Sequence, residues 1–333
     1  MKNQASNIIS ETLLITGAAG SIGRELVKGF ATQSMQRIIL VDLSETGLHS
    51  LLEELNIQFP EVSVSYYVAS ICDTYFLKFL FETYKITTVI HAAAYKHVSL
   101  MEENSCAAIT TNTFGAQLLI DFSIEHNVIR FLTISTDKAV NPINTMGRTK
   151  KVVEDYIQFK INQKPNTALI VLRLCNVFGS VGSVVPVFKN RIEKKLPLII
   201  KDKNLVRYFI VINSVFEMCN WLISEQKNSG FFIPKNYEKT TITAVASRVL
   251  QNLNENPENY PIQFTKLPSN EKLEEDMFSS FENVIEIENA PLNRVVKNEF
   301  KTFDFQLMQK CIVNAMHYNV REANKLLVQL TSG

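Results

Sequence analysis

The architecture of this chain is set by one stretch, Leu13-Leu14-Ile15-Thr16-Gly17-Ala18-Ala19-Gly20-Ser21-Ile22-Gly23. A short apolar run stops at a G-x-x-G-x-x-G turn, and a helix-like segment follows to about Thr32. Glycines let the backbone approach a pyrophosphate, and the helix start offers N–H groups and a positive dipole end. We therefore predict a strand, a tight turn and a helix that bind a dinucleotide through Gly17, Gly20, Ser21, Ile22 and Gly23.

A second apolar run supports this interpretation, because Arg37-Ile38-Ile39-Leu40-Val41 ends at the acid Asp42. An acid about 20 residues after the turn accepts hydrogen bonds from ribose hydroxyls and repels a 2′-phosphate. The cofactor expected is therefore NAD rather than NADP. Ser44 is predicted to cap the next helix, which runs to about Leu55. The alternative, a strand–helix turn without a ligand, is disfavoured by this downstream acid.

Strand-like and helix-like segments alternate over the first half of the chain. Further strands are predicted at residues 64–68, 88–92, 131–134 and 168–172, with helical stretches between most of them. This alternation predicts an α/β fold with a doubly wound parallel sheet. Glycines and prolines interrupt the rhythm after about Asn176. We predict a dinucleotide-binding domain over 1–175 and a smaller substrate-binding domain over 176–333, with some interleaving and two helices over 302–330.

Composition narrows the function classes. The chain has 333 residues, is 46% hydrophobic and carries a net charge of +1. A net charge this small gives no reason to expect a nucleic-acid partner or an anionic membrane. Its five cysteines form no C-x-x-C pair and its five histidines no H-x-x-x-H pair, so we expect no disulfide framework and no metal. We see no apolar run that could span a bilayer and no signal peptide. A reduced, cytoplasmic protein without membrane insertion is expected.

The segment with the most chemistry follows the apolar run 131–134. It reads Ser135-Thr136-Asp137-Lys138-Ala139-Val140-Asn141-Pro142 and continues with Met146-Gly147-Arg148-Thr149-Lys150. A hydroxyl, an acid and a base thus meet at the sheet end where ligands bind. Met146 and Lys150 share one helix face, and Lys150 could hold the nicotinamide ribose and favour deprotonation of nearby acids. The alternative for Asp137 and Lys138 is a salt-bridged surface turn.

Met146 stands where reductases of this plan usually have a tyrosine, and it cannot ionise. A literal Tyr-x-x-x-Lys motif does occur at Tyr156–Lys160. It begins ten residues further along the same predicted helix, roughly 15 Å away, and on a different face. We therefore predict that Tyr156 is a packing or surface residue, and that Asp137 and Lys138 are the acid–base candidates.

These motifs resemble the CapD-like extended short-chain dehydrogenase/reductases, nucleotide-sugar 4,6-dehydratases of bacterial capsule and glycan synthesis. The Met-x-x-x-Lys pair is similar to that of one subgroup. The resembling segments lie within residues 12–212: 16–23, 41–45, His91-Ala92-Ala93-Ala94 through Val98, 101–104, 135–150, 176–180 and 207–209. The small residues after His91 would leave room for the cofactor, although tight helix–strand packing explains them equally well.

The resemblance implies a Rossmann domain, NAD and a nucleotide-sugar substrate. The C4 hydroxyl of a UDP-N-acetylhexosamine, UDP-GlcNAc in our expectation, would be oxidised with bound NAD⁺; a base would remove the C5 proton, water would leave from C6, and the hydride would return there. Lys138 would be that base, Asp137 the acid, Thr136 the partner of the C4 oxygen and Lys150 the ribose ligand, with Met146 beside them. Further cofactor contacts would be Ser44, Ser70, Ile71, Ala92, Ala93 and Ala94. Substrate contacts would be Lys96, His97, Asn176, Ser183, Val184, Arg207 and Glu271. A homo-oligomer, dimer or hexamer, is expected.

The chain departs from the family pattern at three positions. Val181 and Leu267 stand where the family has arginines, and Ser70 stands where it has an aspartate. Many relatives also carry membrane helices ahead of this domain, which we do not find here. Two alternatives therefore stay open: a nucleotide-sugar epimerase or 4-ketoreductase on the same scaffold, and a catalytically weak NAD-binding regulatory protein.

Overall fold

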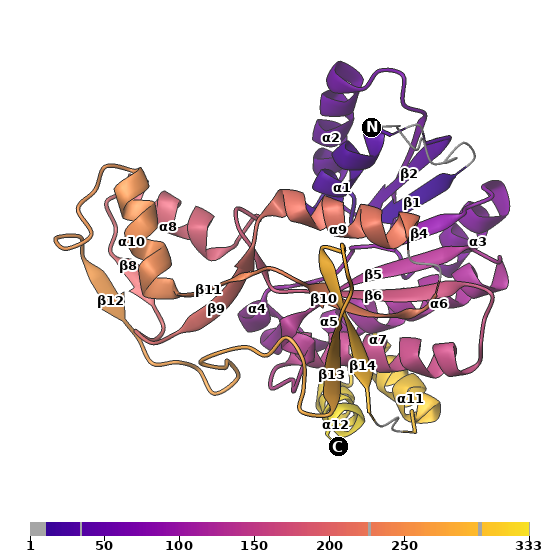
Figure 1. The fold of residues 1–333 in the computed structure, drawn as a ribbon. Coiled ribbons are helices and arrows are strands. Elements are labelled where there is room, and N and C mark those ends of the chain that lie inside the picture. Colours follow the sequence, from indigo (N-terminus) through magenta and orange to yellow (C-terminus); the bar gives the residue numbers. More distant parts are fainter. Residues whose placement is uncertain (1–10, 34, 226–227, 299–301, 333) are drawn as a thin grey trace.

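A nine-stranded sheet forms the main body of the molecule (Figure 1). The computed structural model describes residues 11–33, 35–225, 228–298 and 302–332, and all statements below concern these. The strand order is β13-β14-β10-β6-β5-β4-β1-β2-β3. Neighbours from β10 to β3 are parallel, and β14 and β13 are antiparallel additions at one edge. The strands are β1 (Thr12–Thr16), β2 (Arg37–Asp42), β3 (Val64–Val68), β4 (Thr88–His91), β5 (Arg130–Thr136), β6 (Ala168–Leu174), β10 (Gly230–Pro234), β13 (Glu282–Glu286) and β14 (Leu292–Lys297).

Helices cover both faces of this sheet. On one face α1 contacts α2 and α9; on the other α6 contacts α3 and α7. The central strands β1 and β6 are therefore buried along their whole length, which explains the unbroken apolar runs at residues 13–15 and 168–172. The bounds are α1 (Ser21–Ala31), α2 (Glu45–Gln58), α9 (Ile212–Ser224), α3 (Thr74–Thr83), α6 (Gly115–Glu125) and α7 (Thr145–Asn162). Short elements between β4 and β5 are α4 (Val98–Glu103), α5 (Ser105–Ala108) and the π-helical turn Ile109–Phe114.

The doubly wound α/β fold predicted from the sequence is confirmed. Ser44 caps α2 as expected, because its hydroxyl accepts a hydrogen bond of 3.1 Å from the Gly47 N–H. The strand ends differ from the prediction. β5 runs on to Thr136 and β6 to Leu174, because Ser135 and Arg173 continue the parallel pairing although both are polar. Apolar character alone therefore understates the length of these two strands.

A smaller lobe projects from the main body (Figure 1, left). It contains a three-stranded sheet of β11 (Glu238–Thr241), β9 (Val206–Ile210) and β7 (Asn176–Val177), and a parallel pair of β12 (Ile262–Phe264) and β8 (Leu198–Ile200). Helices α8 (Val184–Glu193) and α10 (Ile242–Asn252) close a second apolar core around residues such as Phe188 and Phe209. The chain builds this lobe in two excursions, since α9 and β10 between them belong to the main body.

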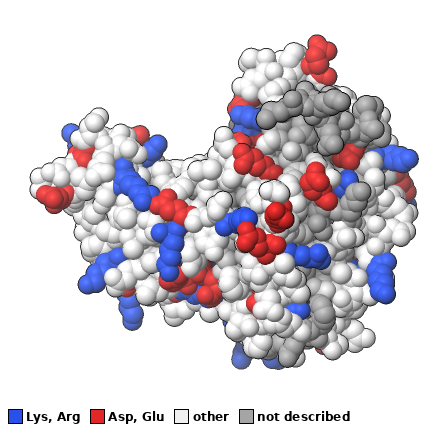
Figure 2. Space-filling view, in the orientation of Figure 1, with Lys and Arg blue, Asp and Glu red and all other residues white. Residues whose placement is uncertain are grey.

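The described chain ends in a helical hairpin of α11 (Phe305–Met316) and α12 (Val320–Thr331), the two helices predicted for this tail. The hairpin packs on α5 and α7, and its Arg148–Thr331 hydrogen bond of 2.6 Å joins α7 to the end of α12. No helix within the described ranges has both the length and the apolar character needed to cross a bilayer. Acidic and basic side chains are interspersed on the face shown in Figure 2.

Candidate active site

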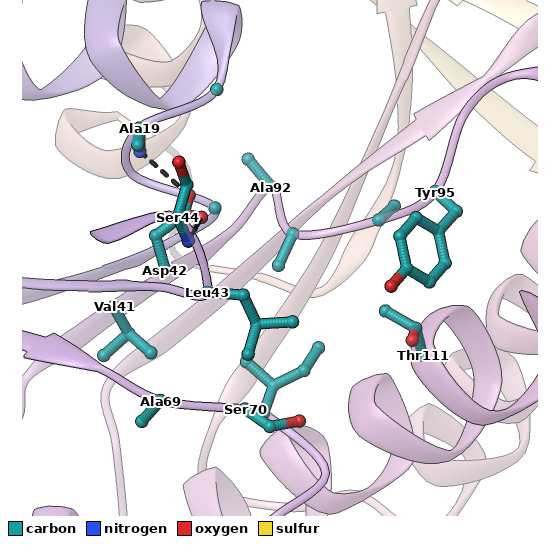
Figure 3. Close-up of a pocket in the computed structure, with 15 residues that line it drawn as sticks. Ala19, Val41, Asp42, Leu43, Ser44, Ala69, Ser70, Ala92, Tyr95 and Thr111 are labelled. Atoms are coloured by element: carbon teal, nitrogen blue, oxygen red, sulfur yellow. Dashed lines mark hydrogen bonds between the residues drawn. The ribbon is translucent and has the colours of Figure 1, made fainter. Parts of the chain in front are cut away.

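A pocket of about 310 Å³ lies at the carboxyl ends of β1, β2 and β4 (Figure 3). Nine of the predicted cofactor contacts line it: Gly17, Gly20, Asp42, Ser44, Ser70, Ile71, Ala92, Ala93 and Ala94. Tyr95, in the loop after β4, and Thr111, in the π-helical turn, form the opposite wall and were not predicted. The sequence gives no local signal for Thr111, because its segment reads as ordinary helix.

Two glycines of the turn are required by the structure. Gly17 has φ +69°, and a Cβ there would lie 2.6 Å from the Ala93 nitrogen. A Cβ on Gly23 would lie 2.0 Å from the Gly17 carbonyl oxygen. No other residue fits these positions without moving the backbone. The turn is therefore built for close approach of β1, β4 and the start of α1.

The first turn of α1 faces this site. Its cap residue is Gly20, which offers no side chain to the helix N–H groups. Four predicted contacts do not line the pocket: Ser21, Ile22 and Gly23, which form this turn, and Lys150 of α7. Ser21 accepts a hydrogen bond of 2.9 Å from the Val181 N–H, and Ile22 packs on the core. What the turn can offer to an anion is thus its backbone and its dipole.

Asp42 is held at the pocket by two backbone donors (Figure 3). Its Oδ2 accepts 2.9 Å from the Ala19 N–H and its Oδ1 accepts 2.9 Å from the Ser44 N–H. Each carboxylate oxygen keeps acceptor capacity for a further donor. The geometry therefore suits a ligand that presents hydroxyl groups to Asp42.

Thr136, Asp137 and Lys138 form one hydrogen-bonded group at the end of β5. Asp137 Oδ1 accepts from Thr136 Oγ1 at 2.9 Å and from Lys138 Nζ at 3.0 Å. Asp137 is completely buried, and its Oδ2 has no hydrogen-bond partner within the described chain. The short turn Asp137–Ala139 holds the acid and the lysine at the carboxyl edge of the sheet.

Helix α7 carries Lys150 and Met146 to the same region. Lys150 Nζ donates 3.0 Å to the carbonyl oxygen of Ile134 in β5. Burial lowers the pKa of Lys150 to about 8, although the charge of Glu154 opposes this shift. Met146 is buried with Met101 and Ala108, so it fills space where a tyrosine would present a hydroxyl.

Tyr156 lies in a packing position, as predicted. Its side chain is buried among the rings of Phe159, Phe303 and Phe305. Its hydroxyl donates 2.6 Å to Asp121 Oδ1, and burial together with this acid raises its pKa. A hydroxyl held in this way does not serve as a base at the sheet end.

The predicted substrate contacts lie in the small lobe and in the loop after β4. Arg207, in β9, is largely buried, and Asn176 Nδ2 donates 3.0 Å to the Tyr208 carbonyl. Lys96 Nζ donates 2.7 Å to the Val181 carbonyl, and burial lowers the pKa of Lys96. His97 lies against Gly182. Ser183 and Val184 stand at the start of α8, and Glu271 lies beside Arg207.

Glu275 is a site residue that the sequence did not reveal. Its side chain is 4% exposed, and burial raises its pKa. Its Oε1 lies 3.9 Å from Lys138 Nζ and 4.0 Å from Arg207 Nη2, so one carboxylate faces both lysine and arginine. Glu275 stands in the charged run Glu271-Lys272-Leu273-Glu274-Glu275-Asp276, where spacing does not distinguish the carboxylate that points inward.

A comparison with known families identifies the chain. Residues 13–297 match the family model described as polysaccharide biosynthesis protein. The chain belongs to this family. The resemblance seen in the motifs is thereby confirmed.

Individual relatives and solved structures of known proteins are also similar to this chain. CapD of Staphylococcus aureus, a capsular polysaccharide biosynthesis protein, is 32% identical over 83% of the chain, which spans only 46% of CapD. A UDP-glucose 4-epimerase of Rickettsia canadensis is 28% identical over 74% of the chain and 71% of its own length. The structure of DesIV, a dTDP-glucose 4,6-dehydratase from Streptomyces venezuelae with NAD and TYD bound, superposes with a TM-score of 0.71 at 17% identity, covering 95% of this chain and 99% of its own. That likeness shows the fold of the short-chain dehydrogenase/reductases.

The pocket of this family member fits a dinucleotide. The glycine turn leaves no room for side chains, the first turn of α1 lacks a side-chain cap, and Asp42 is oriented by two N–H groups. These are the features that a pyrophosphate and a ribose require. In the described part of the chain, no group of three or more histidine, cysteine or acidic side chains is arranged to hold a metal ion.

Proposed function

We propose that the chain is an NAD-dependent nucleotide-sugar 4,6-dehydratase that acts on a UDP-N-acetylhexosamine, with UDP-GlcNAc as the first candidate. One observation carries the proposal. Asp137 and Lys138 lie together at the sheet end, joined through one carboxylate oxygen, while the helix position one turn before Lys150 holds the inert Met146. Elimination of water needs an acid and a base side by side, and this pair supplies both.

The main body would hold the cofactor. NAD, when bound, supplies a hydride acceptor that is regenerated within each turnover. The first turn of α1 would bind its pyrophosphate and Asp42 would accept hydrogen bonds from the adenosine ribose, with Ser44, Ser70 and Ile71 nearby. Lys150 would bind the nicotinamide ribose, and Ala92, Ala93 and Ala94 would leave space beside it.

The group at the end of β5 would do the acid–base work. Thr136 would hydrogen-bond the C4 oxygen of the sugar, and Lys138 would remove the C5 proton once the 4-keto group has acidified it. Asp137 would accept the C4 hydroxyl proton through Thr136 as C4 is oxidised, and would pass that proton to the C6 hydroxyl, which leaves as water. Lys138 would return its proton to C5 at the end of the turnover. The shared oxygen Asp137 Oδ1 holds the threonine and the lysine in fixed relation, so each can serve a different atom of one sugar.

The small lobe would hold the nucleotide. Arg207 would bind the diphosphate, since the guanidinium fork suits phosphate oxygens. Asn176, Ser183, Val184 and Glu271 would complete this side, and Lys96 and His97 would reach it from the main body. The two lobes would thus divide the work, with NAD in the large one and the nucleotide sugar in the small one.

An epimerase is the second candidate, favoured by the 28% identity to a UDP-glucose 4-epimerase. The Asp137–Lys138 pair favours the dehydratase over it, because both reactions begin with oxidation of the C4 hydroxyl but only elimination of water also needs an acid for the leaving C6 hydroxyl. A weakly catalytic NAD-binding regulatory protein is a third candidate, favoured by the absence of arginines at Val181 and Leu267. The three candidates differ in product, which makes them separable.

The deciding experiment incubates the purified chain with UDP-GlcNAc without added cofactor and analyses the product by mass spectrometry. The dehydratase gives a product lighter by one water. An epimerase gives a product of unchanged mass but different chromatographic mobility, and a 4-ketoreductase acts only on a keto sugar with added NAD(P)H. Absence of the dehydrated product with UDP-GlcNAc and several other nucleotide sugars would refute the proposal. The Lys138→Ala variant serves as the background control.

A further inference from the structure

Two cationic side chains in the small lobe share one carboxylate. Lys201, directly after β8, forms an ion pair with Glu271 Oε1, while Arg207 Nη2 lies 3.9 Å from Glu271 Oε2. The three residues come from separate segments, namely the end of β8, strand β9 and the loop between β12 and β13. The fold therefore places the lysine and the arginine on the two sides of a single acid.

The arginine is fixed, and one of its nitrogens is available. Nη1 of Arg207 donates to the carbonyl oxygens of Val206 at 2.7 Å and Leu273 at 3.2 Å. Nη2 instead faces Glu271 and Glu275 at 3.9 and 4.0 Å, beyond hydrogen-bond distance. In the described chain Nη2 thus has acids near it but no hydrogen bond, so a phosphate oxygen could be bound without breaking one.

Lys201 can reach the same phosphate ligand as Arg207. The Lys201 side chain is 41% exposed, against 9% for Arg207, so it can turn on its flexible stem at little cost. The neighbouring loop contributes no cation of its own at residue 267, where Leu267 packs against the second apolar core. Lys201 therefore provides a positive charge beside Glu271.

We propose that Lys201 is the second cation of a diphosphate site, acting with Arg207 on the diphosphate of the nucleotide sugar. The inference rests on the proposed function and adds a binding residue to it. Without ligand, Glu271 neutralises both cations. A diphosphate, with two negative charges, attracts both cations more strongly than one carboxylate does. Lys201 then turns from Glu271 to the phosphates, while Arg207 stays in place and binds them through Nη2.

The test is calorimetric titration of the full chain with UDP, dTDP, UMP and uridine. Lys201→Ala should weaken UDP binding about tenfold, the size of one charge-assisted hydrogen bond, with a smaller effect for UMP and none for uridine. Lys201→Arg should restore most of the affinity, because it keeps the charge. The matched control is Lys203→Ala, which removes an exposed lysine two residues away and should bind as wild type.

Two contrary results are distinguishable. If the wild type binds UDP or dTDP and Lys201→Ala binds it equally well, or loses affinity for uridine to the same extent, the inference is wrong while the proposed function stands. If the wild type binds neither nucleotide, the nucleotide-sugar function itself fails and the inference fails with it. Circular dichroism of Lys201→Ala confirms that any loss is not a loss of fold.

Discussion

Lys150 of helix α7 donates a hydrogen bond of 3.0 Å to the carbonyl oxygen of Ile134 in strand β5. This bond fixes the buried ammonium group of Lys150 beside β5, two residues along the strand from Thr136. Burial is also the main reason that its pKa falls from 10.5 to about 8. Lys150 should therefore lose its proton in mildly alkaline solution, where most lysines stay charged.

The affinity for NAD should depend on this charge. Lys150 is an ammonium ion below about pH 8 and loses its proton as the pH rises through that value. We expect NAD to bind about tenfold more weakly at pH 9 than at pH 7, as measured by fluorescence titration. Lys150→Met should bind weakly at both pH values, whereas Lys151→Met, which removes an adjacent lysine, should keep the wild-type profile. A flat wild-type profile would contradict the role of Lys150.

The same shift has a consequence for stability. The folded pKa lies below the unfolded value, so the unfolded chain binds more protons between about pH 8 and 10.5. The contribution of Lys150 to the free energy of unfolding therefore increases as the pH rises through this window. Urea denaturation at pH 8 and pH 10 should show that the free energy of unfolding of wild type increases relative to that of Lys150→Met. An equal change in both proteins would contradict it.

Lys138→Ala should abolish turnover of the nucleotide sugar while NAD stays bound. The lysine is the proposed C5 base, and alanine leaves no group that can take the proton; the dinucleotide pocket does not include it. Product formation by mass spectrometry and retained NAD by absorbance check the two parts. Near-normal turnover would rule out Lys138 as the base.

Tyr156→Phe should leave turnover within about twofold of wild type, because the hydroxyl points to Asp121 and away from the end of β5. It should lower the free energy of unfolding by about 1.5–3 kcal/mol, the value of a hydrogen bond to a charged group. Activity and urea denaturation measured on the same preparation separate the two effects. A loss of turnover with unchanged stability would make Tyr156 a catalytic residue after all.

Arg173→Met should destabilise the protein by about 3–5 kcal/mol at pH 7. Arg173 is buried in β6 and donates hydrogen bonds to Glu154 of α7 at 2.6 Å and to Glu282 of β13 at 2.8 Å. The variant therefore leaves two buried acids without their cationic partner. Burial alone would raise the pKa of Glu282, but Arg173 brings it down to about 2. The stabilisation from Glu282 is therefore present above the unfolded pKa of about 4.5 and is lost as the pH falls toward 2.

Urea denaturation at pH 7 and pH 4 checks this account. The difference between wild type and Arg173→Met should shrink at pH 4, because protonation relieves the stranded acids in the variant. Arg294→Met, which removes an arginine from neighbouring β14, is the matched control and should show no such pH dependence. A difference of the same size at both pH values would contradict the role assigned to this ion-pair network.

The parts of the site that the sequence could predict are those made by neighbouring residues. The turn from Gly17 to Gly23 and the acid at the end of β2 follow from local rules of strand, turn and helix, and the structure brings them together around one pocket. Thr136, Asp137 and Lys138 are also adjacent in sequence. Their placement at the sheet end needs only the correct assignment of β5.

What the sequence did not predict depends on contacts between distant segments. Glu275 reaches Lys138 across more than 130 residues, and Thr111 lines the pocket from the π-helical turn between β4 and β5. The Arg173 network likewise joins β6 to β13. In each case the sequence shows a charged or polar residue, but its direction is decided by the packing of other elements.

The sheet order also bears on how the protein is made. On a ribosome, β6 is made about halfway through synthesis, its neighbour β10 follows some 60 residues later, and β14 and β13 come only after the second excursion into the small lobe. Until β10 is made, one side of β6 has unpaired backbone groups, and until β13 is made, Arg173 lacks Glu282. The domain that starts first is thus completed last, and the nascent chain passes through a stage with an open, apolar strand edge that other chains could join.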